Sequence, residues 1–339
     1  MLFYLYFCQN FYPLLTPNDI FTIASKKEFE KTTLKVFRHQ FDNNAVYRNF
    51  CKLLGKDKQN VKAIKDIPFL PIQFFKTHEV LSSTDDVQIT FTSSGTTGMT
   101  TSRHLVTDLT YYENSFRLAF SQFYGNIEDY AVLALLPSYL EREGSSLIYM
   151  VEDLIERSNN PDSGFYLHNY DELIKKLTEL ESAGQNILLI GVTYALLDLT
   201  ETQPFNLKNT IIMETGGMKG KRREMIREEL HEILSNGFGV GKIHSEYGMT
   251  ELLSQAYSLG DGIFECPPWM DILVRDTEDA LSYVDTGKTG GINVIDLANI
   301  NSCSFIATQD LGKKYPNQSF EVLGRFDNSD IRGCNLMVL

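Results

Sequence analysis

The chain has 339 residues, of which 43% are hydrophobic and 22% are charged, and its net charge at pH 7 is −13. This is the composition of a globular protein that can bury a sizeable core in two or three structural units. The acidic balance argues against a nucleic-acid partner, because neutralising a phosphate backbone requires clustered Lys and Arg. Anionic substrates must therefore be held locally, by loops and a few placed cations.

The cysteines and the hydropathy of the sequence indicate the cellular compartment of the protein. Five cysteines without regular spacing predict free thiols in a reducing compartment, so we expect a cytoplasmic protein. No apolar run approaches the roughly 18 residues of a membrane-spanning helix, and we expect no membrane span. Residues 1–15 are rich in Phe, Tyr and Leu but carry no Lys or Arg, which argues against a signal peptide. We assign this segment no function.

Residues 1–85 are predicted to form a helical N-terminal region. Apolar residues recur at three- to five-residue intervals over residues 18–53, which is the spacing of amphipathic helices. Residues 67–75 form an apolar segment interrupted by prolines, and this pattern favours an extended chain.

Residues 86–252 are predicted to form an α/β core in which strands and helices alternate. Predicted strands occupy residues 87–90, 131–136, 187–190 and 210–213, and another begins at residue 243. Predicted helices span residues 109–123, 147–157, 171–183 and 221–234, with Gly125 ending the first and Asn169 capping the third. This alternation predicts a mostly parallel sheet flanked by helices.

Residues 253–339 are predicted to form a smaller β-rich subdomain and a C-terminal hinge segment. Short β-prone runs alternate here with Gly, Pro and Asp turns, at residues 262–265, 271–274, 291–295 and 304–308.

One loop in the α/β core has the composition of a phosphate-binding loop. Phe91-Thr92-Ser93-Ser94-Gly95-Thr96-Thr97-Gly98 follows a predicted buried strand, and small hydroxyl residues fill the space between its glycines. Such a loop can turn several N–H groups and hydroxyls toward a polyphosphate. It is not a Walker A loop, because Met99-Thr100 follows it instead of Lys-Ser or Lys-Thr. Taken alone, the same residues also fit a flexible surface turn.

A second glycine turn lies downstream, at His244-Ser245-Glu246-Tyr247-Gly248-Met249-Thr250-Glu251. The pair TSSGTTG and YGMTE resembles the adenylate-forming (acyl-AMP synthetase) superfamily. Within this superfamily the chain is similar to the LuxE-type acyl-protein synthetases, which are related to phenylacetate-CoA ligases. The likeness runs from about Ile67 to the last residue and includes further segments, Ser102-Arg103-His104, LPSYLER at 136–142, ETGGMKG at 214–220 and LSQAY at 253–257.

The resemblance implies a site for ATP and Mg²⁺. It assigns the phosphates to the loop residues Thr92, Ser93, Gly95, Thr96, Thr97 and Gly98, and it assigns phosphate and Mg²⁺ to Thr250 and Glu251, with Glu251 as the metal ligand. It places adenine between Tyr247 and the backbone of Gly216 and Gly217. Asp310 would bind the ribose hydroxyls, and Arg325 the ribose or phosphate. The bland alternatives are a helix N-terminal acid for Glu251, a packed aromatic for Tyr247 and a turn residue for Asp310.

The chain also departs from the superfamily. Full-length members continue into a C-terminal domain that carries a lysine near the acyl-adenylate, whereas this sequence ends just past the hinge motif. We expect that domain to be absent and the cation to be missing or replaced by Lys219, Arg103 or Arg332. LuxE-type enzymes carry the acyl group on a cysteine near the C-terminus, and the matching position is Cys334. A thiolate attacks a mixed anhydride readily, although Cys is also a common core residue.

These motifs lead to three functional hypotheses. The first is an ATP-dependent ligase that activates a carboxylic acid, which we expect to be a fatty acid, to acyl-AMP and transfers the acyl group to a protein thiol. Its catalytic residues would be Cys334, Thr250 and Glu251. Its partners would include an acyl reductase or an acyltransferase. The second is a ligase or acyltransferase that uses coenzyme A or a carrier protein as acceptor, in surface-glycan or secondary metabolism. The third is a degenerate nucleotide-binding subunit. Residues 191–197 are the predicted acyl pocket, or equally a plain core helix.

Overall fold

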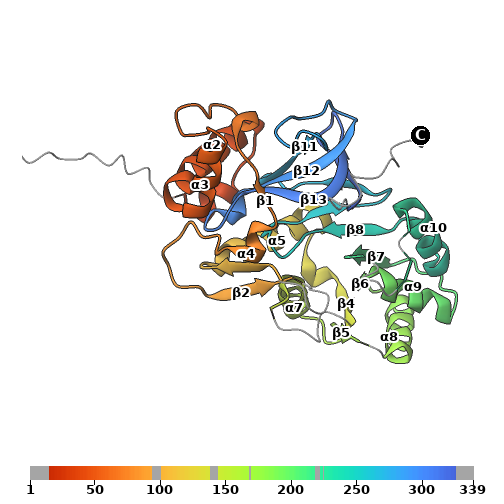
Figure 1. The fold of residues 1–339 in the computed structure, drawn as a ribbon. Coiled ribbons are helices and arrows are strands. Elements are labelled where there is room, and N and C mark those ends of the chain that lie inside the picture. The colour runs from red at the N-terminus through yellow and green to blue at the C-terminus, as the bar shows by residue number, and fades with distance from the viewer. Residues whose placement is uncertain are drawn as a thin grey trace, which may run out of the picture.

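The computed structural model describes residues 15–93, 101–137, 144–167, 169–217, 222–223 and 225–325. Their centre is a twelve-stranded sheet with a parallel half and an antiparallel half, and a separate two-stranded sheet lies beside it (Figure 1). Within these residues, no helix is long and apolar enough to cross a membrane.

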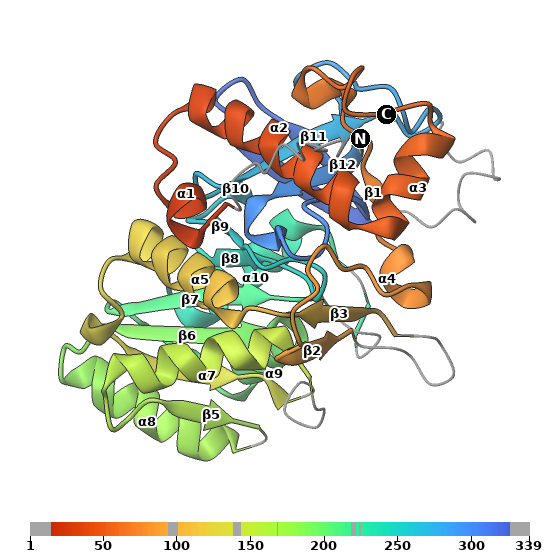
Figure 2. The same ribbon diagram turned by 90° about the vertical axis from the view of Figure 1, so that its left-hand side faces the viewer.

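The parallel half runs in the order β8-β7-β6-β4-β5. The central strands β4 and β6 are apolar and fully buried because helices cover both of their faces. Helices α5 and α7 lie on one face and helices α9 and α10 on the other (Figure 2). The bounds are β4 Ala131–Leu135, β5 Gly164–Tyr166, β6 Ile187–Val192, β7 Thr210–Thr215, β8 His244–Tyr247, α5 Leu109–Tyr124, α7 Ser146–Ser158, α8 Tyr170–Ser182, α9 Thr193–Thr202 and α10 Arg227–Phe238.

The antiparallel half continues the same sheet, because β9 pairs with β8 through Tyr247 and Ala256. Its order onward is β10, β14, β13, β12 and β11, and β1 adds a short parallel pairing to β13. The bounds are β1 Leu70–Pro71, β9 Ala256–Ser258, β10 Ile263–Glu265, β11 Met270–Arg275, β12 Thr289–Asp296, β13 Phe305–Lys314 and β14 Phe320–Arg325, with the turn η3 at Leu297–Asn299. The α/β fold class is confirmed, while the division at residues 85 and 252 stays a prediction.

The N-terminal helices pack against the antiparallel half (Figures 1 and 2). They are α1 Pro17–Phe21, α2 Lys26–Asn43 and α3 Ala45–Leu53, followed by η1 Ile64–Asp66 and α4 Phe74–Thr77. Ser25 caps α2 and Asn44 caps α3, each through a side-chain oxygen that accepts a backbone N–H. The Tyr47 ring stacks on Phe305 of β13 at a centroid distance of 5.9 Å. The predicted helical pattern over residues 18–53 is therefore confirmed.

Two strand predictions need correction. The strand before the phosphate loop is β2, Ile89–Thr92, which pairs only with β3, Arg103–Val106, in the two-stranded sheet. Only Phe91 of β2 is fully buried, so the prediction of a buried strand was wrong. Residues 67–75 are only partly extended, since α4 begins at Phe74 once the second proline has been passed.

Two helix predictions also need correction. The helix predicted at residues 221–234 is α10, which starts at Arg227 and runs past Gly237 to a left-handed cap at Gly239, φ 67°. Asn169 occupies the N-cap position of α8, but its amide binds the Glu172 carboxylate instead of a backbone N–H. In contrast, α5 ends as predicted, at Gly125 with φ 82°.

Candidate active site

The strand that follows the first glycine turn contacts the second glycine turn in the structure. His104 of β3 lies 2.9 Å through Nδ1 from the carbonyl oxygen of Thr250, in the loop after β8. A carbonyl only accepts, so Nδ1 carries the proton and donates it. Burial lowers the pKa of His104 to about 4, so the ring is neutral at pH 7. His104 is thus a packed histidine, edge-on to Phe75, that connects the two motifs.

The base of the phosphate loop is closed by hydrogen bonds between its two ends. Ser102 N donates to Ser93 Oγ at 2.8 Å, and Ser93 N donates to Ser102 O at 3.1 Å. Thr92 N donates to Gly144 O at 2.7 Å. Thr92 and Ser93 therefore stand at the mouth of the loop, whereas Gly95, Thr96, Thr97 and Gly98 lie outside the described residues. The phosphate-binding role of all six residues stays a prediction.

Glu251 is a buried carboxylate without an adjacent cation. Its exposed fraction is 5%, and burial raises its pKa, opposed by a hydrogen bond from Ser102 and by the more distant charges of Arg325 and Lys76. No Lys, Arg or His in the described ranges lies within ion-pair distance of it. Mg²⁺ prefers oxygen ligands and is commonly held by one or two carboxylates with phosphate and water. The Glu251 carboxylate and the Thr250 hydroxyl are ligands of the kind that Mg²⁺ prefers. The described residues contain no cluster of three or more His, Cys, Asp or Glu side chains that could hold a metal ion.

Three of the residues predicted to contact the nucleoside come together at the junction of the sheet halves. Tyr247 Oη donates to Asp310 Oδ2 at 2.8 Å, and Arg325 Nε approaches Asp310 Oδ1 at 3.3 Å. Asp310 lies inside β13, directly opposite Arg325 of β14, so the alternative of a turn residue was wrong. The Tyr247 ring packs on Phe264 and Phe320. The adenine and ribose roles of these residues stay predictions.

The glycine pair follows β7, at the same edge of the sheet. Gly216 has φ 72° and is exposed, as is Gly217. Thr193 Oγ donates to the Gly216 carbonyl at 3.3 Å and fixes the turn. Carboxyl ends of parallel strands are where α/β sheets bind ligands, so β7 and β8 bring Gly216, Gly217 and Tyr247 to one edge. Their joint contact with adenine is not tested by this placement.

The sequence analysis did not identify two glutamates beside these segments as candidate site residues. Glu246 accepts a hydrogen bond from Thr215 Oγ at 2.5 Å, and burial raises its pKa to about 7. A Cβ on Gly248 would lie 2.3 Å from Glu246 Oε1, so a larger residue there would require the Glu246 carboxylate to move. Glu214 is paired with Arg227 and lies 3.6 Å from His231. Burial acts to raise its pKa, but these partners lower it to about 2.

The described cysteines are poor nucleophiles. Burial raises the pKa of Cys51 to about 12 and raises those of Cys266 and Cys303 well above their ordinary values. Cys334 lies outside the described residues. So do Lys219 and Arg332, two of the three candidates for the missing cation. The third, Arg103, is exposed and 3.8 Å from the Glu79 carboxylate.

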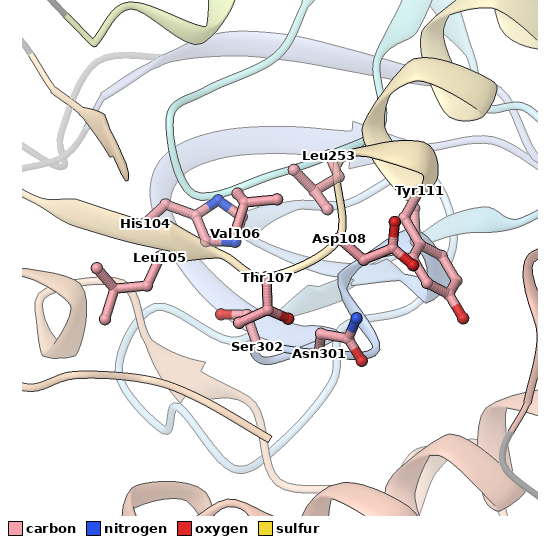
Figure 3. Close-up of a pocket in the computed structure, with 10 residues that line it drawn as sticks. His104, Leu105, Val106, Thr107, Asp108, Tyr111, Leu253, Asn301 and Ser302 are labelled. Atoms are coloured by element: carbon pink, nitrogen blue, oxygen red, sulfur yellow. The ribbon is translucent and has the colours of Figure 1, made fainter. Parts of the chain in front are cut away.

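Two cavities of the described residues are not lined by the predicted acyl pocket. Residues 191–197 are all buried, which fits a core helix as well as a closed pocket. A cavity of about 10 Å³ borders His104, Thr107 and Leu253 (Figure 3), and this volume is enough for roughly one water. A larger groove of about 400 Å³ lies between α10 and β14, lined by charged side chains including Glu228, Lys242 and Glu321.

A family model and two known enzymes resemble the chain in sequence. Residues 17–113 match the family model of acyl-protein synthetase, LuxE. The long-chain-fatty-acid–luciferin-component ligase of Vibrio harveyi is 23% identical over 354 residues, with 95% of this chain and 90% of the relative covered. The enzyme of the same name from Photorhabdus luminescens is 37% identical over 71 residues, which cover 21% of this chain and 60% of the relative.

Solved structures share the fold at low identity. ATP-bound MatB from Rhodopseudomonas palustris superposes with a TM-score of 0.53 at 20% identity, over 72% of this chain and 49% of MatB. The chain therefore spans about half the length of MatB. A 2-hydroxyisobutyryl-CoA ligase in its postadenylation state gives a TM-score of 0.65 at 11% identity, over 92% of this chain and 70% of that ligase. The predicted resemblance to the LuxE-type acyl-protein synthetases is confirmed, and the chain has the fold of adenylate-forming ligases.

Proposed function

We propose that the protein uses ATP to convert a long-chain fatty acid to acyl-AMP and then transfers the acyl group to a protein thiol. The observation that supports this proposal is the contact of β3, the strand that follows the first motif loop, with the Thr250-Glu251 turn through His104. The two relatives named above are long-chain-fatty-acid ligases, which supports a long-chain acid as the substrate.

Adenylation needs the acid, the α-phosphate and the leaving pyrophosphate in line, and it needs the developing negative charge to be neutralised. In the proposed mechanism the fatty-acid carboxylate attacks the α-phosphate, the bond to the β-phosphate oxygen breaks, and pyrophosphate leaves. The residues of this chain orient the nucleotide: Asp310 the ribose, Tyr247 the base, and the 92–98 loop the phosphates. Glu251 and Thr250 would hold Mg²⁺, which supplies charge neutralisation at the phosphates when bound.

Thiol capture is the second proposed step. A thiolate attacks the acyl carbonyl, AMP departs and a thioester forms. The raised pKa values of Cys51, Cys266 and Cys303 disfavour these three as carriers. Cys334 is the proposed internal acceptor, because its position matches that of the acyl-carrying cysteine in LuxE-type enzymes. An acyl reductase or acyltransferase would then consume the thioester.

Mass spectrometry after incubation with Mg-ATP and a panel of acids tests both steps. We expect acyl-AMP with long-chain acids, and a hydroxylamine-labile acyl adduct on the wild-type protein. Cys334→Ser should leave pyrophosphate exchange near normal and abolish the adduct, because an alcohol is a far weaker nucleophile than a partly ionised thiol. Acyl-AMP without any wild-type adduct would point to coenzyme A or a carrier protein as acceptor. The absence of acyl-AMP with every acid would refute the activation step.

A further inference from the structure

The turn that carries Thr250 and Glu251 lacks regular secondary structure, although Glu251 to Gln255 are all buried. A buried loop must satisfy its backbone groups through other parts of the chain. Asn299 Nδ2 donates to the Glu251 carbonyl oxygen at 2.7 Å. Asp296 Oδ2 accepts the backbone N–H of Leu253 at 2.8 Å and of Ser254 at 2.9 Å. The turn is thus held on its C-terminal side by the segment between β12 and β13.

The Asp296 carboxylate is bonded mainly to the loop that follows Glu251. It is fully buried and also accepts Ser254 Oγ at 2.5 Å and Ala298 N at 3.1 Å. No cation among the described residues pairs with it, and these four hydrogen bonds offset only part of the desolvation of the carboxylate. A buried, unpaired acid is a costly way to fill a core, whereas one carboxylate can organise several N–H groups at once.

Asn299 supports the same interpretation. It is fully buried, its amide nitrogen binds the Glu251 carbonyl, and its Oδ1 has no partner in the described part of the chain. Helix α2 in turn holds this segment, because Gln40 Nε2 donates to the carbonyls of Asn299 and Ile300 at 2.9 and 3.0 Å. Gln40 Oε1 accepts Ser304 N at 3.0 Å. Figure 3 shows β3, Leu253 and the 301–302 turn side by side.

We infer that Asp296 and Asn299 are positioning residues that hold the Glu251 turn for a Mg²⁺–nucleotide, with Gln40 of α2 fixing the segment that carries Asn299. The inference rests on the proposed function for the identity of the ligand. Outer partners of this kind are generally worth 10- to 100-fold in metal affinity or activity.

The test compares Asp296→Asn with a matched control, Glu181→Gln. Glu181 also collects N–H groups of a loop that leads into a strand, since its Oε1 accepts from Lys208 N and Asn209 N and its Oε2 accepts from Thr210 Oγ. It lies on α8, away from the Glu251 turn. Calorimetric titration of ATP at several Mg²⁺ concentrations measures binding without requiring turnover, and pyrophosphate exchange measures activity.

For Asp296→Asn we expect the Mg²⁺ concentration that half-saturates ATP binding to rise about tenfold or more, with the KM for the acid within about twofold of wild type. Glu181→Gln should lower thermal stability without moving the Mg²⁺ dependence. A folded Asp296→Asn with wild-type Mg²⁺ dependence overturns the inference. If Asp296→Asn does not fold, Asn299→Ala takes its place, with the same expectation and the same refuting result. Wild-type protein that binds Mg-ATP but makes no acyl-AMP would refute the proposed function alone, since the binding comparison still decides the positioning role.

Discussion

Two buried glutamates at the carboxyl edge of the parallel strands show how differently the fold treats the same side chain. Glu214, at the end of β7, is paired with Arg227 and lies beside His231, and its pKa falls to about 2. Glu251, after β8, has no cation at ion-pair distance in the described part, and burial raises its pKa. The charge of Glu214 is neutralised within the protein. Glu251 has no such partner among the described residues, which fits its predicted role as a Mg²⁺ ligand.

The largest expected effect comes from removing the uncompensated carboxylate. Glu251→Ala should reduce acyl-AMP formation by on the order of 10³-fold or more, because it removes charge stabilisation worth several kcal/mol at the phosphates. The thermal stability should stay near that of wild type, because no internal ion pair is broken. Rapid-quench assays of acyl-AMP at saturating ATP provide the measurement, and near-normal rates in a folded variant would refute the assignment.

Breaking the compensated pair should affect stability instead. Glu214→Gln should cost about 3 kcal/mol of unfolding free energy at pH 7, because Arg227 loses its carboxylate. Since the folded pKa of Glu214 is lowered, its contribution is full above about 4.5 and is lost as the pH falls toward 2. The difference between wild type and variant in urea unfolding should therefore shrink over that range. A difference that does not change with pH would show that packing, not charge, is responsible.

Glu246 should show the opposite pH dependence. Its folded pKa is raised to about 7, so the wild type loses stability as the pH rises from 4.5 to 7. Glu246→Gln should gain relative stability over the same range, by on the order of 1–2 kcal/mol, since the partly exposed side chain keeps some solvation. Thermal melts of both proteins at several pH values test this. Parallel curves would exclude a perturbed Glu246.

The smallest expected effect concerns the junction of the sheet halves. Tyr247→Phe keeps the ring but removes the donor to Asp310, which costs about 1 kcal/mol and should raise the KM for ATP roughly fivefold. Tyr257→Phe is the control, since Tyr257 lies on neighbouring β9 and its hydroxyl binds no described residue. An unchanged KM for ATP in Tyr247→Phe would separate this tyrosine from nucleotide binding.

Local sequence patterns predicted much of the fold because their causes are local. Helical spacing located α2, α3 and α5, Gly125 located a helix end, and apolar runs located β4, β6 and β7. The pairing of β2 only with β3 was missed because an apolar run does not show which partner a strand finds. Asp310 shows the same limit, since an Asp followed closely by Gly favours a turn locally, whereas pairing with Arg325 of β14 makes it a strand residue.

The sequence predicted only those residues of the candidate site that belong to recognisable motifs. Tyr247, Thr250, Glu251, Asp310 and Arg325 stand in recognisable patterns. Asp296, Asn299 and Gln40 do not, because each acts on residues that are distant in sequence: Gln40 is 259 positions from Asn299. Glu246 was missed because its burial depends on strand pairing and on the helices above it. The one sequence signal for these residues was a polar residue among apolar ones, such as Gln40 within α2, which indicates a buried hydrogen bond.

Exchange of labelled pyrophosphate into ATP by the isolated chain tests the central claim most directly. The account predicts Mg²⁺-dependent exchange that requires a long-chain fatty acid and is lost in Glu251→Ala but retained in Cys334→Ser. Binding of Mg-ATP without exchange, across acids of all chain lengths, would contradict it and would identify a nucleotide-binding subunit instead.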